Sequence, residues 1–443
     1  MAHGQLNMVA DKFQWVFSEV LLNACGNDVK LCRRQRIITP FRLGLALTAT
    51  CASQRVETIA DFHCGFNALF GTTVTYKAFY NQVAKPHFAD FSRLMTERLI
   101  GDMTLKVLGF KKGRAFAAFR RIVIQDGSSL AIPDGVREVF PGRFKVVKPA
   151  AVELHTTMDR LCDAPTTVVL SPDTTSEQAF LPEPSSLRAS MLLADRGYVD
   201  LHYLRRVQDA GGFFLIRATA GMNPQVLEAF REDGKRLRSL RNKPLQTIHT
   251  KLPKRQRVEL LVRWDVDGAP LCLRLIVSWT RRTKSFCYFL TNLPAPSYPR
   301  EVICRAYKWR WQVELLFKEW KSYAHLHAFD TANPTLVEGL IWAAIAAAAL
   351  KRFLAHMTPL LVKVPMSTRK VAMCAVHVLG GIVQALKTGD VAGLSDALEE
   401  AVTYLACHAQ RPHPKRDRQT GRAQLGLEPC FEHDDVIEFA DAA

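Results

Sequence analysis

The sequence predicts an α/β protein, with a mixed-sheet core between two helical regions. Apolar residues recur at helical spacing over the first 118 positions, where β-branched alternation is scarce. From about position 119, β-branched runs and a strand–helix–strand unit replace that pattern. Helical spacing returns near position 298. These changes of pattern indicate a sheet between two sets of helices.

Segment boundaries are expected where the patterns change. The predicted segments are a helical N-terminal region at 1–118, the first part of the core at 119–217, a basic β-rich insertion at 218–297, a Glu-bearing core helix at 298–330, a helical C-terminal region at 331–410 and a tail at 411–443. The tail has little apolar surface to bury, so we expect it to be disordered.

Each predicted core strand is an apolar or β-branched run that stops at turn residues. The predicted strands lie at 121–126, 150–159, 165–172, 191–195 and 212–219, with a helix at 201–211 between the last two. The first strand stops at Asp126-Gly127, and the fourth stops at Asp195-Arg196-Gly197. Antiparallel candidates followed by a strand–helix–strand unit predict a mixed sheet.

The charge of the chain favours a polyanionic partner. It has 59 Lys and Arg against 42 Asp and Glu, a net charge of +17, over 443 residues that are 48% hydrophobic. Such a protein can bury a large core, and its excess of cations attracts nucleic acid because neutralised phosphates release counterions. The basic N-terminal region is therefore a candidate DNA-binding region, although a solvated helix face would have the same composition.

The insertion carries most of this charge. Residues 212–300 contain 17 Lys and Arg against 6 Asp and Glu, a net +11 of the chain's +17. We expect a phosphate-binding surface here, with Lys254, Arg255 and Arg257 in it. Trp264 and Trp279 lie in the same segment, where an indole can stack on an unpaired base. Packing in the core of the insertion is the simpler alternative for both.

Membrane insertion and export are not expected. The most apolar stretch, 339–350, is shorter than the ~20 residues that span a bilayer. The N-terminus lacks a charged segment followed by an apolar one. The 11 cysteines include no CxxC pair and no zinc spacing, which predicts reduced thiols in a cytoplasmic protein.

Three carboxylates are placed where they could share cations. Asp126 and Asp195 end predicted strands, and Glu314 lies on a predicted helix from about 299 to 323. Acidic groups at a sheet edge repel one another unless a hard cation such as Mg²⁺ lies between them. A turn role is the alternative for each aspartate alone. His155, in the middle strand, could approach this site or be a structural histidine.

The Glu-bearing helix has two distinct faces. Tyr307, Arg310, Glu314 and Lys321 fall within about 60° of its surface at about 100° per residue. The opposite, apolar stripe consists of Val302, Ala306, Trp309, Val313, Leu316 and Trp320. The apolar stripe must face the core. The polar stripe is either a site-facing edge or a salt-bridged solvent face.

At this point a family resemblance is visible. Tyr307-x2-Arg310-x3-Glu314-x6-Lys321 resembles the Y-R-E-K signature of the insertion-sequence-4 family of DDE transposases. The segments IQDGSSLAIP and ADRGYVD resemble the strands that carry the first and second aspartates of that family. The resemblance covers about residues 120–330.

The resemblance implies a ribonuclease H-like mixed-sheet catalytic core with a β-rich insertion, flanked by helical regions. It implies that Asp126, Asp195 and Glu314 bind two Mg²⁺ ions, with Mn²⁺ as a substitute, for cleavage and strand transfer at the inverted-repeat ends of an insertion sequence. The partners would be double-stranded DNA and a second copy of the chain. By the same resemblance, Tyr307, Arg310 and Lys321 position the DNA backbone.

Two other functions remain open at the level of sequence. A metal-dependent nuclease of this fold would cut DNA without joining strands. A catalytically silent DNA-binding protein could keep the scaffold, but it would have no use for an acidic cluster facing phosphate.

Overall fold

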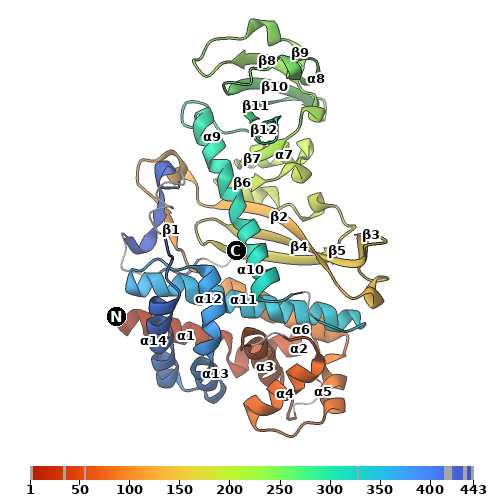
Figure 1. Cartoon of the computed structure of the whole chain (residues 1–443), viewed down its shortest axis with the longest axis vertical. Helices are drawn as coiled ribbons and strands as arrows, with labels where there is room; N and C mark the ends of the chain where they lie inside the picture. The colour runs from red at the N-terminus through yellow and green to blue at the C-terminus, as the bar shows by residue number, and fades with distance from the viewer. Residues whose placement is uncertain are drawn as a thin grey trace.

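The computed structural model describes residues 3–32, 36–53, 56–326, 329–413, 422–432 and 437–440. A helical part forms one end of the molecule, and a long sheet rises from it toward the other end (Figure 1). The N-terminal helices are α1 (His3–Val16), α2 (Glu19–Asp28), α3 (Pro40–Ser53), α4 (Ile59–Phe70), α5 (Tyr76–Val83) and α6 (His87–Asp102). These helices lie where helical spacing was predicted.

One mixed sheet of eleven strands runs through the core and the insertion. Its strands are β2 (Ile122–Ala131), β3 (Pro141–Phe144), β4 (Lys148–Asp159), β5 (Ala164–Pro172), β6 (Met191–Ala194), β7 (Phe213–Ala218), β8 (Gln225–Phe230), β9 (Lys243–Pro244), β10 (Val258–Val266), β11 (Ala269–Thr280) and β12 (Ser285–Thr291). Because one sheet contains all of them, the core and the insertion are structurally continuous.

The core strands lie in the order β5-β4-β2-β6-β7. The pairs β4–β5 and β2–β4 are antiparallel, whereas β2–β6 and β6–β7 are parallel. Helix α7 (Leu201–Asp209) supplies the crossover that the parallel pair β6–β7 requires. This mixed order, with the first long strand in the centre, agrees with the expected ribonuclease H-like arrangement.

The insertion extends this sheet. Strand β12 pairs antiparallel with β7, and β11, β10, β8 and β9 follow in that order toward the tip of the molecule. The apolar side chains of β8, β10 and β11 that are buried share a core with those of β7 and α7. The strands therefore continue across position 218, where the change of composition had suggested a boundary.

One strand end differs from its prediction. The strand containing Asp126 does not stop at Gly127, because β2 runs on to Ala131. Residues 127–131 stay paired with β4, whereas pairing with the shorter β6 ends at Gln125. Asp126 therefore lies where the parallel pairing ends, inside a longer antiparallel strand.

The remaining elements are mostly helical. They are α9 (Arg300–Ala306), a 3-10 turn at Tyr307–Arg310, α10 (Trp311–Tyr323), α11 (Pro334–Val362), α12 (Thr368–Cys374), α13 (Leu379–Thr388) and α14 (Val391–His408). Helix α10 packs against β2, and α11 packs against α6 and α3 (Figure 1). The helix predicted at 299–323 thus contains a 3-10 turn in its middle.

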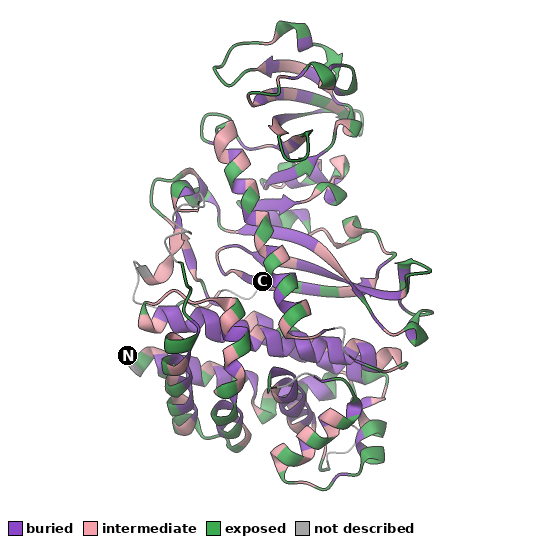
Figure 2. Ribbon diagram, in the orientation of Figure 1, coloured by how far each residue is buried: buried purple, intermediate pink, exposed green. Residues whose placement is uncertain are grey.

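Helix α11 is longer than the apolar stretch that predicted it. At 29 residues it is long and apolar enough to cross a membrane, but 94% of its most apolar window is buried inside the protein. Figure 2 shows it as an almost continuous buried rod. Gly339 makes close packing possible, since a Cβ there would lie 2.4 Å from the Phe88 ring of α6. The helix is the centre of the helical core.

The described part of the tail, for which disorder was predicted over 411–443, contains one short strand and a few buried side chains. Strand β13 (Leu427–Pro429) pairs with β1 (Leu108–Phe110), and Leu425, Leu427 and Ile437 are buried. These apolar side chains give the segment the core contacts that its polar composition had seemed to exclude. The rest of that prediction, at 414–421, 433–436 and 441–443, lies outside the described residues.

Candidate active site

The sheet register places the two aspartates side by side. Gln125 and Ala194 form the last pair of the parallel strands β2 and β6, and Asp126 and Asp195 are the next residues on each strand. Side chains alternate between the faces of a sheet, so both aspartates share one face. Ile124 and its neighbours on that face pack in the core beneath α10 and α11.

Glu314 approaches the same place from the first turn of α10. The guanidinium of Arg310 joins it to Asp126: Nη1 lies 2.6 Å from Asp126 Oδ2, and Nη2 lies 3.2 Å from Glu314 Oε1. Arg310 and Asp126 are each only 13% exposed in their side chains, whereas Glu314 is 41% exposed. The acidic site therefore opens to solvent on the Glu314 side.

The other two residues of the polar stripe also face the sheet. Tyr307 Oη donates to Asp195, with a distance of 3.2 Å to Oδ1, and Lys321 Nζ donates to the carbonyl oxygen of Ser129 at 2.8 Å. The predicted apolar stripe is buried at Ala306, Trp309, Val313, Leu316 and Trp320, and Val302 is partly buried. The polar stripe is therefore an edge that faces the site rather than a solvent face.

Burial dominates the electrostatics of Asp126. It raises the pKa of this carboxyl to about 7; Arg310 opposes the rise, and Glu314 and Asp195 add to it. Burial also raises the pKa of the Tyr307 hydroxyl, and the nearby Asp195 adds to the rise. The single guanidinium of Arg310 therefore does not neutralise the negative charge of the acidic site.

The donor set suits a divalent metal, but this conformation does not form a metal centre. Within the described ranges, no group of three or more His, Cys, Asp or Glu side chains is arranged to hold an ion. Between two of the carboxylates lies the guanidinium of Arg310, which is paired with both Asp126 and Glu314. Three carboxylates are nevertheless the oxygen ligands that a hard cation prefers, and the buried Asp126 needs more positive charge than it has.

His155 lies outside this site. It is paired with Gly127 in the sheet and points to the face opposite Asp126. Its Nε2 is 2.9 Å from Ser171 Oγ, its ring stacks on Phe180, and burial lowers its pKa to about 4. The structural alternative is therefore the correct one for this histidine.

The predicted residues of the insertion are not part of the acidic site. They lie on or just before β10, which β11 and β12 separate from the core strand β7. Lys254 Nζ lies 4.7 Å from the ring centroid of Trp279, and Arg257 forms an ion pair with Glu232 at 2.8 Å. Arg255 is exposed.

The two tryptophans of the insertion take part in packing. Trp264 Nε1 donates to the carbonyl oxygen of Met222 at 3.0 Å, and its ring packs against the core of the insertion. Trp279 contacts Phe286 edge to face, with ring centroids 4.8 Å apart. These contacts favour the packing alternative, most clearly for Trp264 because its N–H is already satisfied.

Sequence reasoning missed a buried glutamate behind the site. Glu153, on β4, is 3% exposed, and its Oε2 accepts from Arg143 Nη2 at 3.2 Å. A Cβ added to Gly127 would lie 2.6 Å from Glu153 Oε1, so this carboxylate fills the space behind the residue that follows Asp126. The sequence feature that could have revealed Glu153 is a charged residue in the middle of an otherwise apolar predicted strand.

The fold and the site together define a class: a mixed-sheet protein with two neighbouring aspartates where parallel strands end and a glutamate on the helix that packs against them. Comparison with known sequences gives the family. The sequence model for the transposase DDE domain matches residues 117–350, more than half of the chain, so the chain belongs to that family.

Individual relatives agree with this assignment. The chain is 36% identical over 77 residues to the putative transposase InsL for insertion sequence element IS186A of Escherichia coli K12, a match that covers 17% of this chain and only 21% of that relative. It is 20% identical over 375 residues to the transposase for insertion sequence element IS231F of Bacillus thuringiensis subsp. israelensis, which covers 75% of this chain and 77% of the relative.

Among solved structures, the chain is similar to one in the cryo-EM structure of the piggyBac transposase synaptic complex with hairpin DNA. The superposition covers 92% of this chain and 86% of that chain, at 9% identity and a TM-score of 0.45.

Proposed function

We propose that this protein is a DNA transposase of the insertion-sequence-4 type, which binds the inverted-repeat ends of an insertion sequence, cuts them and joins them to target DNA. Membership of the DDE domain family supports this function. Two observations support the site assignment: Arg310 bridges Asp126 and Glu314, and the register of β2 and β6 puts Asp195, which accepts from Tyr307, beside Asp126.

Asp126, Asp195 and Glu314 are the proposed metal ligands and catalytic residues. Two Mg²⁺ ions bound there, or Mn²⁺ as a substitute, would supply the charge that activates the attacking oxygen and stabilises the leaving one. Since Glu314 is more exposed than Asp126, DNA is expected to enter from its side.

The remaining residues of the stripe position the DNA backbone in this proposal. Arg310 and Lys321 carry the positive charge that gives strong hydrogen bonds to phosphate oxygens, and the Tyr307 hydroxyl offers one further donor. All three already point toward the carboxylates or toward β2, so a phosphate brought to the metals would meet them without a change of fold.

The proposed substrates are the double-stranded ends of the element and a double-stranded target. The cations of the insertion, including Lys254 and Arg255, would hold flanking DNA away from the cut. Because each chain has one site of this kind and an element has two ends, we propose that a homodimer forms the synaptic complex.

The test uses a supercoiled plasmid that carries a marker between the DNA segments flanking this gene. Asp126→Asn, Asp195→Asn and Glu314→Gln should each abolish cleavage in Mg²⁺ while retaining DNA binding in a gel-shift assay. Asp134→Asn, an exposed change on the turn after β2, should leave cleavage intact. Wild-type cleavage by any of the three site variants would refute the assignment.

The same assay separates the alternatives. Cut plasmid without joined products would indicate a nuclease that lacks strand transfer. Specific binding by the wild-type protein with neither cutting nor joining would indicate a silent DNA-binding protein.

A further inference from the structure

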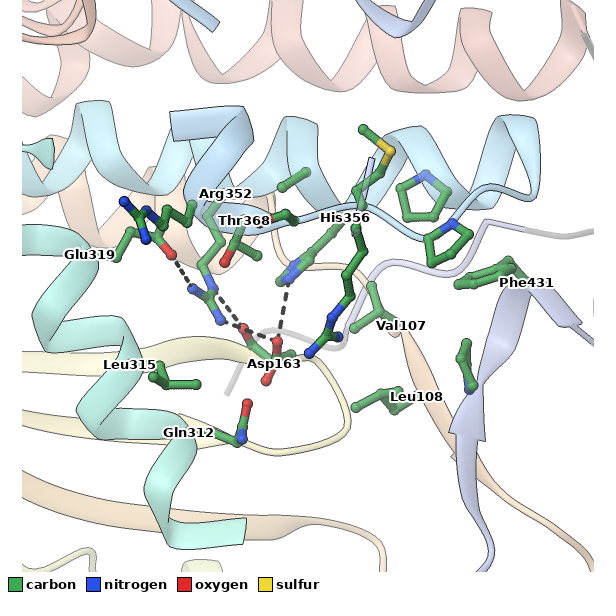
Figure 3. A pocket seen from close by; sticks show the side chains of 18 of the residues that line it. Val107, Leu108, Asp163, Gln312, Leu315, Glu319, Arg352, His356, Thr368 and Phe431 are labelled. Carbon is green, nitrogen blue, oxygen red and sulfur yellow. Dashed lines mark hydrogen bonds and ion pairs between the residues drawn. The ribbon is translucent and has the colours of Figure 1, made fainter. Parts of the chain in front are cut away.

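A second candidate site lies on the other side of α10 from the carboxylates. It is a cavity of about 390 Å³ between α10, α11, the turn that joins β4 to β5, and the chain after α14 (Figure 3). Leu315 and Glu319 of α10 line it, whereas Glu314 of the same helix faces Asp126 through Arg310. The volume falls within the range of small-molecule sites.

The floor of the cavity is a network of ion pairs in which the positive and negative charges balance. Arg352 Nη1 donates to Glu319 Oε2 at 2.9 Å, and its Nη2 donates to Asp163 Oδ2 at 3.2 Å. Arg160 Nη1 also donates to Asp163, at 2.8 Å. Two carboxylates thus meet two guanidiniums, so the floor has no net charge to attract or repel a ligand.

One polar atom of the floor has no hydrogen-bond partner in the described part of the chain. His356 lines the cavity beside Asp163 (Figure 3), and the residue is 7% exposed. Its Nε2 lies 3.8 Å from Asp163 Oδ2, which is close enough for an ion pair but too far for a hydrogen bond, and it makes no other hydrogen bond to the described residues. A buried ring nitrogen without a hydrogen bond is costly, and a polar group of a ligand would satisfy it.

The rim supplies charge and the walls supply apolar surface. Two exposed cations line the cavity, Lys318 and Arg369, and Arg369 lies over the Tyr323 ring. Arg411 and Arg422 also line it but have partners of their own, so the charge offered to a ligand comes from Lys318 and Arg369. The walls include Leu315 and Met366, and the aromatic ring of Phe431 lies on the side away from α10 (Figure 3). With a neutral floor, the rim makes the cavity attractive to an anion that carries a flat, partly apolar body.

We propose that this cavity binds a nucleotide, with the phosphate at the cationic rim and the base between the apolar walls and His356. The rim meets the phosphate charge, the walls meet the faces of the base, and the Nε2 that lacks a hydrogen bond meets a polar atom at its edge. The nucleotide is either free in solution or an unpaired nucleotide of a bound DNA strand. No residue of the acidic site is among the described residues that line this cavity, so the proposed nucleotide site goes beyond the proposed function.

Calorimetric titration of the full-length protein with deoxyadenosine monophosphate tests the proposal. We expect saturable binding, at least tenfold weaker for inorganic phosphate and for deoxyadenosine alone, because each lacks one half of the contacts. Arg369→Glu should weaken binding at least tenfold by reversing a rim charge, and Leu315→Trp should do so by filling the cavity. Both side chains are exposed, so both variants are expected to fold.

Lys387→Glu on α13 is the matched control, since it makes the same change of charge outside the cavity. Asp126→Asn should bind the nucleotide normally, which separates this proposal from the catalytic one. Displacement of the nucleotide by a short single-stranded oligonucleotide would identify DNA as the source, and no displacement would identify the free nucleotide. Absence of saturable binding, or equal binding by the wild-type and Leu315→Trp proteins, would overturn the proposal.

Discussion

Arg310 Nη1 lies 2.6 Å from Asp126 Oδ2, although 184 positions separate the two residues. The same guanidinium reaches Glu314 and so occupies the space between two of the three carboxylates. A metal shared by those carboxylates needs that space, and a guanidinium beside it would be repelled. In the proposed metal-bound state, Arg310 would have to turn away from these carboxylates, and its guanidinium would then be available to a phosphate.

Removing the Arg310 guanidinium should therefore favour metal binding. We expect Arg310→Ala to bind Mn²⁺ more tightly than the wild-type protein by calorimetry, because the metal no longer competes with an internal cation. The metal-free variant should also unfold at a lower temperature, since Asp126 loses its counterion. Lys308→Ala, an exposed neighbouring change, should alter neither property. An unchanged affinity for Mn²⁺ in Arg310→Ala would refute the competition.

Lys321 should contribute more to complexes with the DNA ends of the element than to nonspecific DNA binding. Its ammonium donates to the Ser129 carbonyl on β2, three residues after Asp126, so it lies beside the proposed site. We expect Lys321→Ala to weaken complexes with end DNA more than it weakens nonspecific binding, with a stability loss of about 1 kcal/mol from the missing hydrogen bond. Lys321→Met, which keeps the stem, should behave alike. If Lys321→Ala weakened binding to end DNA and to nonspecific DNA equally, Lys321 would contribute only nonspecific charge.

The insertion should contribute to the salt dependence of DNA binding. Replacing Lys254 and Arg255 with glutamine removes two cations, so the slope of log affinity against log salt should become shallower by about 1.8. Arg257→Gln is a useful comparison because Arg257 is already paired with Glu232. That variant should change the slope much less. If the double change left the slope of log affinity against log salt unaltered, Lys254 and Arg255 would not contact DNA.

Glu153 should make stability depend on pH. Burial, with help from Glu177, raises the pKa of Glu153 from 4.5 to about 7, so between those values the folded protein holds a proton that the unfolded chain has lost. Stability must then fall as pH rises through this window, by about 3 kcal/mol at most for this group. Glu153→Gln should remove that part of the fall in urea denaturation at pH 5 and pH 8.

Glu138→Gln, an exposed change, provides the control for this experiment. Its stability should follow the wild-type dependence on pH. Parallel curves for the wild-type and Glu153→Gln proteins would show that the buried carboxyl does not titrate in this window.

Sequence alone predicted the parts of the site that depend on local pattern. The spacing of Tyr307, Arg310 and Glu314 sets which helix face they share, and that face does meet the sheet. Asp195 was correctly placed just after a buried strand. The strand containing Asp126 was cut short because Asp-Gly is a strong turn signal, whereas pairing with β4 keeps those residues extended.

The rest depends on contacts between distant segments, which no local pattern contains. The bond between Arg310 and Asp126 follows from how α10 crosses β2, and the ion pair between Arg352 and Asp163 joins residues 189 positions apart. The pairing of β13 with β1, which accompanies the burial of Leu427, is another contact of this kind.

The parallel register of β2 and β6 has a genetic consequence. Four residue pairs, from Ile122–Met191 to Gln125–Ala194, determine which way the following aspartate on each strand points. Suppose that one codon is lost within either strand while the other strand pairs stay in register. The aspartate that follows would then point to the opposite face of the sheet, where α7 packs, and the two aspartates would be separated. Loss of two codons would restore its direction but shift it along the sheet. A deletion scan should therefore find these short strands intolerant of one missing residue even where every remaining side chain is apolar.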